Sequence, residues 1–282
     1  MRAPLLIGVL LCTAGCFTTR YLAQAAAGQV SLIAHAKPLS SVVKNPATPP
    51  HVQLLLSRVP DMKAFGESRG LKPTDNYGRY TDLDRGAAVW VVQACEPLKF
   101  APKRWSFPIA GTVPYLGWFD EAAARAYAEQ VKAEEGLDVD VRGAGAYSTR
   151  GWFKDPVLST MIGEGPEAAG WLANTVLHES VHATLYVPGQ SSFNESLASF
   201  VGDYLTDEFL TTYFGSDSRE AKAYAASAKG GQERVARLHR AYEELDAVYK
   251  SDLGDDQKRA RKAELLAELK AELKTKRDFN NA

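Results

Sequence analysis

The chain has 282 residues, a formal net charge of −1 and 45% hydrophobic residues. This length and hydrophobic content support a sizeable core in one large or two small domains, and the near-neutral charge gives no reason to expect nucleic acid or an anionic partner. No segment reaches the roughly 18 apolar residues that a transmembrane helix needs.

The N-terminal residues have the features of a secretory targeting segment. Arg2 is a basic start, and residues 3–11 form an apolar run that is too short to span a bilayer. Thr13-Ala14-Gly15-Cys16 resembles the lipobox of bacterial lipoproteins, in which cleavage precedes the cysteine and the cysteine carries a lipid. We therefore expect a lipoprotein signal peptide over residues 1–15 and a lipid anchor at Cys16. This predicts a protein of the cell envelope, held at a membrane and facing the periplasm or the cell exterior; the alternative is an ordinary signal peptide with an incidental Cys16.

The first half of the mature chain alternates helical and strand patterns. Residues 87–94 are β-branched and aromatic, and residues 138–142 alternate with period two, so both predict strands. Residues 147–153 predict a further strand, which is either a plain core strand or a sheet edge along which an extended peptide could lie. The remaining predictions are helices over residues 21–43, 52–66 and 120–135, a connector over 44–50, a turn at 76–78, and a mostly irregular stretch with one short strand over 105–115.

The most informative motif is His178-Glu179-Ser180-Val181-His182, a His-Glu-x-x-His element. On a helix with about 3.6 residues per turn, two histidines four positions apart lie on one face and can bind one ion. Glu179 is offset by roughly 100°, where it can contact a water instead of the metal. The motif predicts a catalytic zinc site with His178 and His182 as ligands and Glu179 as general base. The alternative is two polar residues on an ordinary amphipathic helix.

A third ligand is predicted at Glu195, which is separated from His182 by twelve residues. Pro188-Gly189 ends the first helix and a second begins at about Ser192, so a short loop would bring Glu195 back to the rings. Two histidines and one carboxylate leave the fourth zinc position open, as in catalytic rather than structural sites. In the competing interpretation, Ser192 and Glu195 form a capping box that serves only the helix start. The two active-site helices are expected over about residues 166–214.

The C-terminal third predicts further helices. Residues 218–228 and 232–250 are helical in pattern and are separated by Gly230-Gly231. Residues 255–276 are highly charged with a narrow stripe of leucines, which is typical of a solvated surface helix and less often of a partner-binding helix. The oligomeric state is left open by these patterns.

The segment Asn194-Glu195-Ser196-Leu197-Ala198 is similar to the Asn-Glu-x-x-Ala signature of gluzincins, zinc peptidases whose third ligand is a glutamate on the second helix. More closely, most of the chain after Cys16 resembles a family of bacterial aminopeptidases that are often predicted lipoproteins. The matching stretches are residues 109–115, 145–160 and 178–202.

The resemblance implies one zinc ion held by His178, His182 and Glu195, a catalytic Glu179, and a peptide substrate. The expected fold is a single α+β, zincin-like domain over residues 16–282, mostly helical with a small mixed sheet beside the active-site helix.

Departures from better-known gluzincins leave the reaction open. Ser199 stands four residues after Glu195, where thermolysin-like sequences have an acid that supports a ligand histidine, and Asp203 is a candidate to replace it. The Gly-x-Met-Glu-Asn motif, by which well-studied zinc aminopeptidases hold the substrate amino terminus, is absent. The expected function is a zinc-dependent peptidase of aminopeptidase type; an endopeptidase of the same chemistry and a non-hydrolytic, membrane-anchored peptide-binding lipoprotein are the alternatives. Residues 279–282 look like the start of a further family segment, as in a truncated chain.

Overall fold

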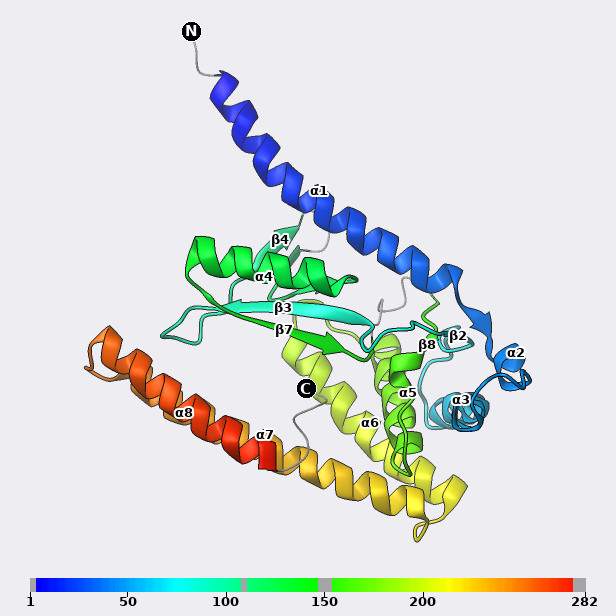
Figure 1. Cartoon of the computed structure of the whole chain (residues 1–282). Helices are drawn as coiled ribbons and strands as arrows, with labels where there is room; N and C mark the ends of the chain where they lie inside the picture. Colours follow the sequence, from blue (N-terminus) through cyan, green and yellow to red (C-terminus); the bar gives the residue numbers. More distant parts are fainter. Residues whose placement is uncertain (1–3, 108–110, 147–153, 276–282) are drawn as a thin grey trace. The chain divides into compact units, whose positions relative to one another are not determined.

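The structure is a computed structural model, and it describes residues 4–107, 111–146 and 154–275 (Figure 1). Helices dominate, and short strands form small sheets, so the predicted α+β class is confirmed. The chain divides into two compact units: unit 1 contains Met1–Ser31, Val89–Ala144 and Ala236–Ala282, and unit 2 contains Leu32–Ala88 and Gly145–Val235. Among the described residues, none of the helices combines the length and the hydropathy that crossing a membrane requires.

Unit 1 is organised around an antiparallel sheet in the order β6-β3-β7, formed by β3 (Val89–Cys95), β6 (Leu116–Trp118) and β7 (Asp138–Ala144). Helix α4 (Glu121–Glu135) packs on this sheet, and residues that favour a helix start and a helix end stand at its two ends. Asp120 caps its start by accepting a hydrogen bond from the Ala123 N–H, and Gly136 ends it with a φ of 65°. β3 and β7 confirm the strands predicted at 87–94 and 138–142, with bounds that differ from the predicted ones by one or two residues. A separate antiparallel pair, β4 (Trp105–Phe107) and β5 (Gly111–Val113), forms where one short strand was expected.

The outer edge of β6 is covered by side chains of α1 (Pro4–Ala34). The Gln24 amide donates to the Gly117 carbonyl at 3.1 Å and accepts from the Phe119 N–H at 3.2 Å, as a neighbouring strand would. The Gly117 N–H donates to the Tyr21 hydroxyl at 3.2 Å. Backbone groups of an edge strand need partners, so this helix closes one side of the sheet.

Helix α7 (Arg219–Lys250) runs without a break through Gly230-Gly231, so the predicted split into two helices is wrong. Each glycine lowers helix stability by about 1 kcal/mol relative to alanine, but long flanking runs of good helix formers outweigh that. Helix α8 (Asp255–Thr275) forms as predicted. Leu265 and Leu273 of its stripe are each only 6% exposed and Arg237 of α7 forms an ion pair with Glu272, so α8 is more than a solvated surface helix.

Unit 2 contains the predicted active-site helices and a small mixed sheet. The sheet has the order β1-β2-β8, with β1 (Lys37–Pro38) antiparallel and β8 (Val157–Leu158) parallel to β2 (Arg79–Thr81). A short α2 (Leu39–Val43) follows β1, and a single 3-10 turn, η1 (Ser159–Met161), follows β8. The strand predicted at 147–153 lies outside the described residues.

The core of unit 2 lies around α5 (Ala168–Thr184), which contacts both α3 (Pro50–Ser68) and α6 (Ser191–Phe214). Figure 1 shows α5 and α6 side by side. Helix α3 continues through Pro60. Large, fully buried side chains of this core come from all three helices: Leu56, Val59 and Met62 from α3, Leu172 and Leu177 from α5, and Phe209 and Leu210 from α6. Tyr224 of α7 is buried with them.

Candidate metal centre

The His-Glu-x-x-His motif lies on the last two turns of α5. Leu177 and Val181 face the core and are 0% and 3% exposed, which fixes the rotation of the helix. The side chains of His178 and His182 then lie on the adjacent flank, 20% and 9% exposed. Helix α5 begins at Ala168 and ends at Thr184, so it starts after Pro166 and stops before Pro188-Gly189. The motif is therefore helical and half-buried, as its spacing predicts.

A tight connection returns the chain to the motif. Asn194 is 2% exposed; its amide oxygen accepts from the Val187 N–H at 2.9 Å, and its amide nitrogen donates to the Val187 carbonyl at 2.8 Å. Helix α6 starts at Ser191 with Gln190 in the N-cap position, and no side chain caps it. Ser192 and Glu195 therefore lie inside the first turns, and the capping-box interpretation of this pair is wrong.

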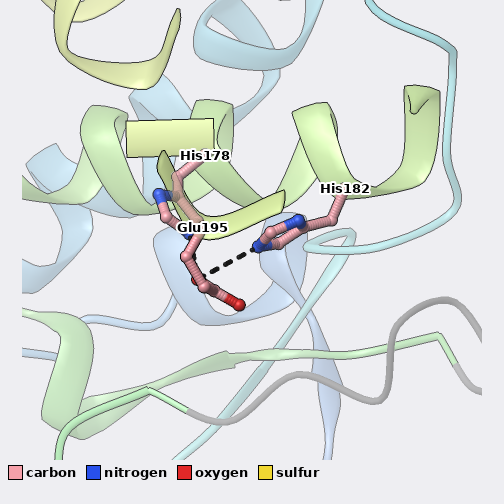
Figure 2. Close-up of side chains that lie close together, drawn as sticks. All are labelled: His178, His182 and Glu195. Carbon is pink, nitrogen blue, oxygen red and sulfur yellow. Dashed lines mark ion pairs between the residues drawn. The ribbon is translucent and has the colours of Figure 1, made fainter. Parts of the chain in front are cut away.

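Glu195 faces both histidines (Figure 2). Its Oε2 atom lies 3.5 Å from Nε2 of His178 and 3.5 Å from Nε2 of His182. The two imidazole rings are nearly perpendicular, at 84°, with centroids 4.9 Å apart. One ligand atom from each residue lies within 4.8 Å of the others, so the group could hold a metal ion.

The two oxygen–nitrogen distances fit ligands of one metal ion better than they fit a hydrogen bond. A ring N–H donating to a carboxylate lies about 2.7–3.2 Å away, which is shorter than the two distances here. Two ligand atoms at about 2.1 Å from a tetrahedral zinc ion are separated by about 3.4 Å. The observed value of 3.5 Å for both pairs is therefore close to that of co-ligands of one ion. The Glu195 side chain is 60% exposed, which leaves the group open towards solvent.

Two polar atoms next to this group are buried and have no hydrogen-bond partner within the described part of the chain: Oε2 of Glu179 and Nδ1 of His182. Buried polar atoms are normally paired, so such exceptions tend to occur at functional sites. The free Glu179 oxygen can take up a hydrogen bond from a water or a substrate. A metal-bound imidazole usually donates its second N–H to a supporting acceptor, and the described residues do not provide one for His182.

Asp203, the candidate supporting acid, has a different partner. It accepts a hydrogen bond at 2.8 Å from the amide of Asn174, which lies one turn before His178 on α5. Asn174 and Thr206 also hydrogen-bond to Tyr224, and burial together with the charges of Asp203 and Asp207 raises the pKa of that phenol. Asp203 thus links α6 to α5 rather than orienting a histidine.

Tyr77 belongs to the surroundings of Glu179 but was not selected from the sequence. It is 3% exposed, has a φ of 61°, and donates its N–H to the Asp155 carbonyl at 2.7 Å. Burial raises the pKa of Tyr77 well above its ordinary value, and the negative charges of Glu179 and Asp155 raise it further. The phenol therefore stays protonated beside the glutamate. The sequence predicted only the turn at residues 76–78, because it is the fold that brings Tyr77 within reach of the Glu179 charge.

In a comparison with protein families, residues 20–281 match the family model described as "Putative aminopeptidase". The chain belongs to this family. The aminopeptidase family implies a peptidase and a peptide substrate, and its description names no cofactor. Comparisons with curated proteins and with solved structures gave no match.

Proposed function

We propose that this member of the aminopeptidase family is a zinc-dependent peptidase. The observation that carries the proposal is the position of one Glu195 oxygen, 3.5 Å from a nitrogen of each motif histidine. His178, His182 and Glu195 would together hold one zinc ion per chain, in a zincin-like arrangement. When bound, zinc would polarise the scissile carbonyl and lower the pKa of water to about 7.

Glu179 is the proposed general base. It accepts a proton from the attacking water as the water oxygen bonds to the carbonyl carbon, and it delivers that proton to the amine nitrogen as the C–N bond breaks. Its buried Oε2 has no partner among the described residues and can make the required hydrogen bond to water. Neighbouring positions on a helix are offset by roughly 100°, so Glu179 is placed to contact a water on the metal rather than to bind the metal itself.

The direct test is Glu179→Gln, which removes the base but not a ligand. We expect the variant to bind zinc with wild-type stoichiometry, measured by metal analysis, and to lose essentially all peptide hydrolysis. Glu129→Gln is the matched control, because Glu129 is an exposed glutamate on α4 of unit 1. Retained hydrolysis by Glu179→Gln would remove this residue from the chemistry.

The aminopeptidase assignment follows the family and is tested separately. An aminopeptidase requires the free ammonium of its substrate, so N-acetylation of a peptide library should abolish cleavage. Equal cleavage of free and acetylated peptides would instead indicate an endopeptidase of the same chemistry. Binding of one zinc per chain without cleavage of either library would favour the non-hydrolytic, membrane-anchored binding protein.

We also propose that the protein is a lipoprotein of the cell envelope, anchored through Cys16. The support is the lipobox-like Thr13-Ala14-Gly15-Cys16 that follows a basic and apolar start. Mass spectrometry of the N-terminal peptide from the producing cell should show a chain that starts at Cys16 and carries acyl groups. A chain that starts elsewhere, or an unmodified Cys16 in the membrane fraction, would refute the anchor.

A further inference from the structure

Helix α6 comes close to α5 at a glycine, Gly202. A Cβ atom added at Gly202 would lie 3.3 Å from the Cα, the Cβ and the N atom of His178. That is shorter than an ordinary van der Waals contact, which needs about 3.5–4.0 Å between carbon atoms. The neighbouring atoms belong mainly to the helix backbone and cannot rotate away. Any larger residue at this position would therefore have to push the two helices apart by a few tenths of an ångström.

Gly202 also shares a face of α6 with Glu195. The two residues are seven positions apart, about two helical turns, which places them on the same side of the helix. Between them on the buried side is Ala198, another small residue, which is 0% exposed. Because a helix interior is stiff over two turns, a shift of α6 at Gly202 moves the Glu195 carboxylate with it.

The other end of the helix hairpin is fixed by Asn194, which precedes Glu195. Its amide bonds to both backbone polar groups of Val187 hold the connection closed, and the side chain is buried. Glu195 thus lies between a fixed loop and a close contact of the helices at His178. Metal–ligand distances tolerate deviations of about 0.2 Å, so displacements of a few tenths of an ångström matter at this position.

We propose that Gly202 and Asn194 are positioning residues, which set the spacing of α5 and α6 so that Glu195 meets His178 and His182. The inference rests on the proposed zinc site. It assigns a role to a glycine, a residue that weakens a helix interior relative to alanine.

The test is the zinc affinity of Gly202→Ala, measured by competition with a chelator, beside the control Gly230→Ala. Gly230 also lies inside a helix, but an added Cβ there meets nothing within 4 Å. We expect Gly202→Ala to bind zinc at least roughly 10-fold more weakly, as for residues that orient metal ligands, and Gly230→Ala to bind like wild type. The visible absorption of bound Co²⁺ should change in Gly202→Ala alone, since it reports the ligand geometry directly.

A double-substitution cycle separates positioning from general packing. In a Glu195→Ala background, Gly202→Ala should weaken zinc binding by less than about threefold, because the ligand it positions is already absent. A loss below about threefold for Gly202→Ala in the wild-type background, with an unchanged Co²⁺ spectrum, would overturn the inference. Full additivity with Glu195→Ala would overturn it as well.

Asn194→Ala provides the second variant if Gly202→Ala does not fold, because it removes two hydrogen bonds and adds no bulk. The same loss of zinc affinity and change of the Co²⁺ spectrum are expected, and wild-type affinity would refute the positioning role. Asn45→Ala is its control, since Asn45 also bonds backbone, at the Ala47 N–H, away from the site. If the unsubstituted chain binds no zinc, the proposed zinc site itself is refuted. If that chain binds zinc and the variants bind it equally well, only the positioning role is refuted.

Discussion

At the scale of single residues, the ligand group combines one local and one non-local contribution. His178, Glu179 and His182 could be predicted because their relation depends only on the helical repeat, which the sequence states directly. Glu195 could be predicted from a motif, but whether it reached the rings depended on the loop between α5 and α6. The bonds of Asn194 to Val187 explain why a short connection suffices.

Tyr77 marks the limit of sequence reasoning at this scale. Its position beside Glu179 follows from the contact of the 74–78 loop with Asp155, and from Lys63, which donates to the Thr74 and Asn76 carbonyls at 2.8 and 2.6 Å. No spacing rule connects these distant segments, so the residue could not be found from periodicity or motifs.

The raised pKa of Tyr77 predicts an alkaline loss of stability. Below pH 10 the phenol is protonated in both states; above its ordinary pKa of 10 the unfolded chain releases the proton first, so the free energy of unfolding falls as pH rises. We expect Tyr77→Phe to make this fall shallower between about pH 9 and 11, measured by urea unfolding at several pH values. Tyr204→Phe, at a residue that is 65% exposed, should keep the wild-type slope; identical slopes for all three proteins would contradict the prediction.

At the scale of elements, the sequence predicted most helices because their ends and periodicities are local. Helix α4 has a capping aspartate and a terminal glycine, and both work as the sequence indicates. The error at Gly230-Gly231 has a physical cause: glycine weakens a helix but ends it only where the backbone turns left-handed. Short strands such as β1 and β8 were missed because a two-residue strand is defined by its partner rather than by its own residues.

Helix α6 carries two aspartates, Asp203 and Asp207, one turn apart. Burial raises the pKa of Asp207, and the charge of Asp203 raises it further. A raised pKa means that the charged form is disfavoured on folding, so stability falls as pH rises above the ordinary value of 3.8. We expect Asp207→Asn to increase the free energy of unfolding at pH 7 by roughly 0.2–0.5 kcal/mol, and to have no effect near pH 3.

Thermal unfolding at the two pH values measures this difference. Asp252→Asn, in the exposed turn between α7 and α8, is the control and should leave the unfolding midpoint unchanged at both. A destabilised Asp207→Asn at pH 7 would show that the carboxylate has a favourable partner.

At the scale of the whole molecule, the chain passes from one unit to the other after Ser31, Ala88, Ala144 and Val235. Neither unit is continuous in sequence, which is why composition and linkers gave no boundary between them. The expectation of a single domain over residues 16–282 remains a prediction, and coincident unfolding of both units would support it. All three proposed zinc ligands belong to unit 2.

Bound zinc should therefore stabilise unit 2 more than unit 1. At a free zinc concentration about 100-fold above its dissociation constant, binding contributes about 2.7 kcal/mol. We expect a chelator to speed amide hydrogen exchange in α5 and α6 of unit 2, and to leave β3 and β7 of unit 1 unchanged on the same time scale. Mass spectrometry of the exchanged peptides measures both units in one sample, and equal acceleration in both would argue against a local site.

The side-chain amide of Gln24 occupies the place of a missing strand next to β6. Shortening the chain from its N-terminus past this residue would therefore do more than remove a leader. It would leave the backbone groups of Gly117 and Phe119 without their partners from Gln24. The edge of β6 would then be exposed, and a strand of a second molecule could pair with it. Forms that begin after Gln24 should self-associate at concentrations where the full chain does not. Forms that begin before Gln24 keep its two hydrogen bonds and should not.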